Sequence, residues 1–62
     1  MDEADFQKMI RQTLESRRQL ALAMLRAYAA GELEHTPEDI ADQQSELDEC
    51  NAELAELDSG QA

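Results

Sequence analysis

The sequence has few of the residues with which small proteins hold a core together. It contains no Trp, 1 Tyr, 1 Phe and 1 Cys in 62 residues. A chain this short buries too little apolar surface to be comfortably stable without a metal, a disulfide or a partner chain. A single cysteine excludes an intramolecular disulfide, and the lack of CxxC, HExxH or Cys/His clusters argues against a structural zinc. Self-association is therefore the leading way to complete the core.

Glycine, proline and β-branched residues are also scarce, while Ala, Leu, Glu and Gln dominate. This composition predicts an all-α protein. No run approaches the roughly 20 apolar residues that a membrane span requires. The N-terminal MDEADF lacks the basic region and apolar core of a signal peptide. Because the chain also carries a free cysteine, we expect a cytoplasmic protein.

Positive charge is missing from the second half of the chain, and the net charge of the whole chain is −10. Residues 1–30 hold all 5 Lys and Arg residues and 4 of the 15 acidic ones, which gives about +1. Residues 31–62 hold the other 11 acidic residues and no Lys or Arg, which gives about −11. This asymmetry argues against DNA or an anionic membrane as ligands of the second half. It favours a basic protein partner, or simple solubility.

A long amphipathic helix is expected over residues 4–30, because no Gly or Pro interrupts the chain there. At about 100° per residue, apolar side chains gather on one broad face. They are Phe6, Ile10, Leu14, Ala21, Met24, Leu25 and Tyr28, with Met9, Leu20 and Ala27 widening the face. The opposite side carries the residues that we call the basic stripe, Lys8, Arg11, Arg18 and Arg26.

One charged residue, Arg17, falls near the middle of that apolar face. It can snorkel, so that its aliphatic stem covers apolar surface while the guanidinium reaches water. Alternatively, it is buried or interfacial and paired with an acid or an amide, which would fix the helix register at some cost in stability. The sequence leaves both interpretations open.

The clearest helix start in the chain lies at Thr36, which can cap, followed by Pro37 at a favoured first position and two acids in the first turn. A heptad pattern then predicts a helix over residues 37–57. We expect one helical-hairpin domain over residues 1–57 and a flexible tail over residues 58–62. The seam of this second helix is Ile40, Gln43, Leu47, Cys50, Leu54 and Leu57.

A connection of about four or five residues makes the two helices antiparallel neighbours. Counting outward from it places Tyr28 near Ile40, and Leu20 near Leu47. The apolar face of the first helix is wider than one narrow seam can cover, so we predict that two hairpins assemble as a dimeric four-helix bundle. The expected oligomer interface consists of Phe6, Met9, Ile10, Arg17, Leu20, Met24, Tyr28, Leu47, Cys50 and Leu54.

Nothing in the sequence predicts catalysis. The carboxylates of the second helix are expected on a convex, solvated face, without a pocket to raise one pKa above another. Cys50 lies on the apolar seam without a neighbouring His and reads as a small buried hydrophobe. His35, the single imidazole, has no second ligand near it and is expected to be exposed. We therefore expect no enzymatic activity, no cofactor and no metal site.

Two charged surfaces remain as candidates for binding. Carboxylates at helical spacing on the second helix can keep the protein soluble, or can dock a basic protein, for instance by mimicking the charge of a nucleic acid. The basic stripe offers a different class of function, the binding of RNA or a nucleotide, although the net charge of −10 opposes it. We call the first surface the acidic stripe; its residues are Asp42, Glu46, Glu49, Glu53 and Glu56.

Two helices joined by a tight turn within 62 residues resemble the Rop family of plasmid RNA-binding proteins, dimeric four-helix bundles, in length and layout. The stretch GEL…PED…C…ELAEL resembles the small subunit of exonuclease VII, and the layout is similar to that of small type III secretion chaperones. None of these resemblances carries a functional residue onto a position of this sequence. Tiny acidic helical proteins are also common among phage-encoded inhibitors of host proteins.

The sequence therefore predicts a small acidic, non-enzymatic protein that binds and modulates or inhibits a protein partner, and it is compatible with a phage or mobile-element origin. The acidic stripe is the expected contact with a basic partner. The alternatives are an RNA- or nucleotide-binding regulator that uses the basic stripe, and a small chaperone or structural assembly subunit whose apolar face caps a client.

Overall fold

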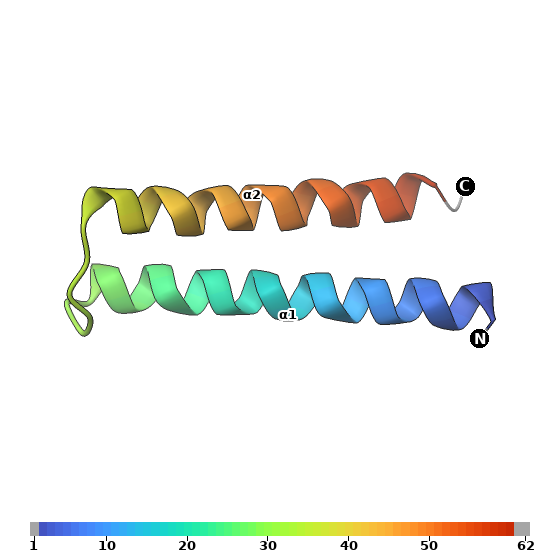
Figure 1. Ribbon diagram of the computed structural model, residues 1–62, viewed down its shortest axis with the longest axis horizontal. Coiled ribbons are helices and arrows are strands. Elements are labelled where there is room, and N and C mark those ends of the chain that lie inside the picture. Colours follow the sequence, from blue (N-terminus) through green and yellow to red (C-terminus); the bar gives the residue numbers. More distant parts are fainter. Residues whose placement is uncertain (1, 61–62) are drawn as a thin grey trace.

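The computed structural model describes residues 2–60, which form a two-helix hairpin (Figure 1). Helix α1 spans Glu3–Ala29 and helix α2 spans Pro37–Ser59. The helices lie side by side and antiparallel, with both ends of the chain opposite the connection. The hairpin measures 43 × 18 × 14 Å. The 27 residues of α1 extend about 40 Å at 1.5 Å per residue, so the hairpin is about as long as this one helix.

The all-helical hairpin predicted from the sequence is thus confirmed, whereas its assembly into a four-helix bundle stays a prediction. Over the described residues, neither helix is long and apolar enough to cross a membrane.

The start of α2 is fixed by a complete capping box. The Oγ1 of Thr36 accepts a hydrogen bond from the backbone N–H of Asp39 at 3.2 Å, and the backbone N–H of Thr36 donates to Oδ2 of Asp39 at 2.9 Å. Pro37 occupies the first turn, where its missing N–H costs nothing. By contrast, Asp2 precedes α1 without a side-chain capping bond. The beginning of α2 is therefore the better defined of the two helix starts.

The end of α1 is closed by a glycine in the left-handed conformation. Gly31 has φ 74° and donates its N–H to the carbonyl of Tyr28 at 3.1 Å, while Glu32 donates to the carbonyl of Ala27 at 3.0 Å. These two bonds satisfy carbonyls that the helix leaves unpaired, in the pattern of a Schellman motif. In the connection, the ring of His35 stacks on Tyr28 with centroids 4.7 Å apart, although His35 stays exposed as expected.

The core of the hairpin is small and lies toward the end with the two termini. Leu14 of α1 packs with Cys50 and Leu54 of α2, and Ile10 and Leu57 pack against this cluster. The buried position of Cys50 agrees with its place on the heptad seam. Few large side chains are buried, so the hairpin has little hydrophobic stabilisation beyond this cluster.

Two details differ from the sequence-based expectations. Leu20, expected opposite Leu47, is 64% exposed, while its neighbour Ala21 is 1% exposed. The side of α1 that faces α2 advances in steps of three and four residues, which includes Ala21 and turns Leu20 about 100° away. Moreover, α2 continues to Ser59 rather than to position 57, so the first two residues of the predicted tail are helical. Of that tail, positions 61–62 lie outside the described residues.

The capping box gives a direct test of the fold. We expect Thr36→Ala to lower the free energy of unfolding by about 1 kcal/mol, because it leaves the backbone N–H of Asp39 without its acceptor. Urea unfolding followed by circular dichroism measures the change. Thr13→Ala is the matched control, since Thr13 is exposed within α1 and its hydroxyl bonds only to the carbonyl of Met9. An equal loss in both variants would contradict the role of the cap.

Candidate protein-binding groove around Arg17

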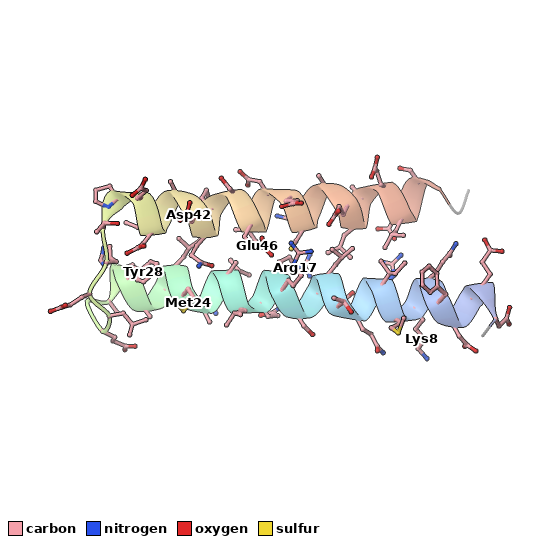
Figure 2. The ribbon with its side chains drawn as sticks, viewed as in Figure 1. Lys8, Arg17, Met24, Tyr28, Asp42 and Glu46 are labelled. Atoms are coloured by element: carbon pink, nitrogen blue, oxygen red, sulfur yellow. The ribbon has the colours of Figure 1, made fainter. Side chains whose placement is uncertain are left out.

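A guanidinium surrounded by three carboxylates lies midway along the hairpin. The Nε of Arg17 donates to Oε1 of Glu46 at 2.6 Å. Its two terminal nitrogens approach Glu49 at 4.0 Å and Glu53 at 3.9 Å. Figure 2 shows Arg17 and Glu46 reaching toward each other across the space between the helices. The structure therefore favours the paired interpretation of Arg17, with the guanidinium half-buried.

This arrangement shifts the pKa of both groups of the closest pair. The hydrogen bond with Glu46 is the main cause that raises the pKa of Arg17, and the same bond holds the pKa of Glu46 below its ordinary 4.5. A carboxylate whose pKa is lower in the folded state stabilises the fold above its ordinary pKa. That stabilisation is lost as the pH falls through the lowered value.

The acidic stripe does not lie on a purely convex, solvated face. Its three central residues approach Arg17, whereas Asp42 and Glu56, at its two ends, are exposed and form no ion pair with it. One buried oxygen of Glu53 has no hydrogen-bond partner, although it lies 3.9 Å from Arg17. The stripe is therefore the wall of a groove rather than an isolated surface.

Two shallow grooves follow the space between the helices and share Arg17. The larger, of about 550 Å³, runs from Arg17 toward the chain ends. The smaller, of about 340 Å³, runs from Arg17 toward the connection. The larger groove is lined by Gln7, Met9, Ile10, Thr13, Leu14, Arg17, Glu53, Glu56, Leu57 and Gly60. The smaller groove is lined by Arg17, Leu20, Ala21, Asp42, Gln43 and Glu46.

The predicted oligomer interface, apart from Arg17, divides into three groups in the structure. Cys50 and Leu54 belong to the core of the hairpin itself, so they are not free to meet a second chain, whereas Ile10 packs against this core and stays partly buried. Met24, Tyr28 and Leu47 are half-buried. The residues of α1 that remain exposed, which we call the apolar strip, are Phe6, Met9 and Leu20.

The basic stripe does not form a continuous free track along α1. Arg11 pairs with Asp58 at 2.6 Å, and Arg18 donates to Oδ1 of Asn51 at 3.5 Å, so both turn toward α2. Lys8 and Arg26 are exposed, and Lys8 projects away from α2 (Figure 2).

The sequence reasoning missed the groove itself, including the contributions of Gln7, Thr13 and Leu57 to its lining. A signal was available. A heptad through Ile10, Leu14, Arg17 and Ala21 continues the pattern of α2 on the facing side of α1. Extended along both helices, this pattern would have placed Arg17 in the seam and the acidic stripe beside it.

Over residues 2–60, no group of three or more His, Cys, Asp and Glu side chains is placed to hold a metal ion. No family model, curated protein or solved structure matches this chain. The arrangement of its own residues is therefore the basis for the function proposed below.

The Arg17–Glu46 pair predicts a specific pH dependence. We expect Glu46→Gln to lower the urea midpoint of unfolding near pH 7, because the hydrogen bond loses its charge. The difference from the unmodified protein should shrink as the pH falls below 4.5 and disappear below the lowered pKa of Glu46, where this group of the folded protein is also neutral. Glu15→Gln, which removes one exposed carboxylate from α1, corrects for the change in net charge. An equal difference near pH 7 and near pH 3 would exclude the pair as its source.

The thiol of Cys50 should be unreactive in the folded chain. It is fully buried, and burial raises its pKa, so little thiolate is present to attack a reagent. We expect uncharged iodoacetamide to modify it at least about tenfold more slowly in native buffer than in urea. Ser45→Cys in a Cys50→Ala background places the thiol on an exposed position of α2 and should react at similar rates in both. Rapid native labelling of Cys50 would show that the core opens readily.

Proposed function

We propose that this chain is a non-enzymatic binding protein that engages a basic segment of another protein and modulates or blocks that protein. The observation that supports it best is the position of the acidic stripe. All of its carboxylates except that of Glu49 line the same grooves as the exposed Met9 and Leu20 of α1, and Arg17 supplies the single positive charge there. A surface that is both apolar and strongly acidic suits a partner that is both apolar and basic.

The charge of the second half of the chain supports fast encounter with such a partner. Residues 31–62 carry 11 acidic residues and no Lys or Arg. A field of one sign raises the association rate with cationic molecules and disfavours anionic ones. One form of this binding is charge mimicry, in which the acidic stripe occupies the nucleic-acid site of a basic protein.

The alternative of RNA binding through the basic stripe receives less support. Arg11 and Arg18 already contact α2, and the net charge of −10 repels phosphate. The homodimer predicted from the sequence concerns self-association and stays a prediction. A second copy could cover the apolar strip, but it would bring a second acidic stripe toward the first, and like charges in an interface oppose association.

Capture from a cell extract tests the proposal. The immobilised chain should retain basic proteins both with and without nuclease treatment. Replacing Asp42, Glu49 and Glu56 by their amides should reduce capture at least about tenfold, because attraction and steering are lost. The control replaces Glu15, Glu34 and Asp48 by their amides, which changes the net charge equally at exposed positions outside both grooves.

Helicity should stay unchanged in both triple variants, since Glu46 and its bond to Arg17 are kept. Equal capture by the two variants would mean that the acidic stripe is not the binding surface. If nuclease treatment abolishes the capture of proteins from the extract, the result would favour the RNA alternative.

A further inference from the structure

We propose that the two grooves that meet at Arg17 together accept one amphipathic α-helix of the partner, about four turns long, with an apolar ridge and Lys or Arg residues along one flank. This inference rests on the proposed function and gives the conformation and side-chain pattern of the basic segment.

The length follows from the residues of α1 that line the grooves. They run from Gln7 at the far end of the larger groove to Ala21 in the smaller one. At 1.5 Å per residue, this stretch of 15 positions extends about 21 Å, which matches a helix of about 14 residues. The lining residues of the other wall run from Asp42 of α2 to Gly60, which directly follows that helix.

The shape follows from the two-helix architecture. Two parallel cylinders leave a lengthwise groove on each face, and a third helix laid into one of them completes a three-helix bundle. An extended peptide has no such match, because the backbone groups of both helices are bonded internally and offer no strand edge. The apolar side chains that the ridge would contact are Met9, Ile10, Leu14, Leu20 and Leu57.

The distribution of charge follows from the two walls of the grooves. The wall formed by α2 carries Asp42, Glu46, Glu53 and Glu56, whereas the wall formed by α1 is apolar or neutral except for Arg17. A bound helix therefore needs cations only on the flank that faces α2. Its other flank passes over Met9, Thr13 and Leu20.

A second copy of this chain fits this pattern poorly. Its α1 offers an apolar face, but Arg11 and Arg18 are already in contact with its own α2. It would also bring its own acidic residues close to the groove. Complementarity of charge thus favours a basic helix of a different protein as the occupant.

Synthetic helices test the inference. The probe is a labelled 14-residue peptide with Leu at i, i+3, i+4 and i+7 spacing and Lys and Arg on one flank. We expect fluorescence anisotropy to detect saturable binding, and circular dichroism to show that the peptide gains helix. A scrambled peptide of equal composition, which cannot form an apolar ridge, should bind at least about tenfold more weakly.

Variants of the groove give the second arm. Met9→Gln combined with Leu20→Gln should weaken binding of the amphipathic peptide at least about tenfold, because both side chains line the groove. Leu33→Gln is the matched control. It removes an apolar side chain of similar exposure to Met9, 43% against 45%, but from the connection between the helices. This control should bind within about twofold of the unmodified chain.

The outcomes separate this inference from the function on which it rests. Equal binding of the ordered and scrambled peptides would overturn the helix groove and leave acidic docking intact. If neither peptide binds, and if capture from the extract is unaffected by the substitutions in the acidic stripe, both the helix groove and the proposed function would be overturned. Light scattering adds one more decisive result: a dimer of the chain that the peptide does not displace would identify a second copy as the occupant and overturn the inference.

Discussion

The charge of Arg17 is the constraint around which the hairpin is arranged. A guanidinium that lies half-buried in the seam between two helices loses part of its hydration, and an anion on the facing helix offsets that loss. Glu46 meets this need at 2.6 Å, and Glu49 and Glu53 add weaker attraction. Apolar contacts between two helices tolerate sliding more readily than a directed ion pair does. The pair therefore helps to set the register in which Leu14 meets Cys50 and Leu54.

The same constraint makes the acidic stripe part of the groove. Carboxylates that balance a seam arginine must lie at the edge of the interhelical space, beside whatever apolar residues the hairpin leaves uncovered. One cation balances only part of their charge, so an excess of negative charge stays next to Met9 and Leu20. A structural requirement inside the hairpin thus produces a surface with a distinct preference for its partner.

Local signals in the sequence predicted the helices well. The capping residues at Thr36, the glycine at position 31 and the later part of the heptad of the second helix each have one strongly favoured structure, and each was found there. Ile40, the first residue of that heptad, is 40% exposed instead. The groove was not predicted, because Arg17 was compatible with two environments that differ only in the position of the facing helix. Leu20 and Ala21 show the same limit. Both are apolar, and only the register between the two helices decides that Ala21, the smaller one, is buried.

The position of the connection at one end also sets the chain entropy that each contact between the helices must offset. Contacts near Gly31 join residues close in sequence, whereas the Arg11–Asp58 pair near the open end joins residues 47 positions apart. Closing the longer loop costs more chain entropy, which the apolar contacts toward the open end, around Leu14 and Leu54, must offset. The larger groove lies at that end, between Gln7 and Gly60. A ligand that fills it would contact both helices where no connection joins them and would slow the fraying of their ends.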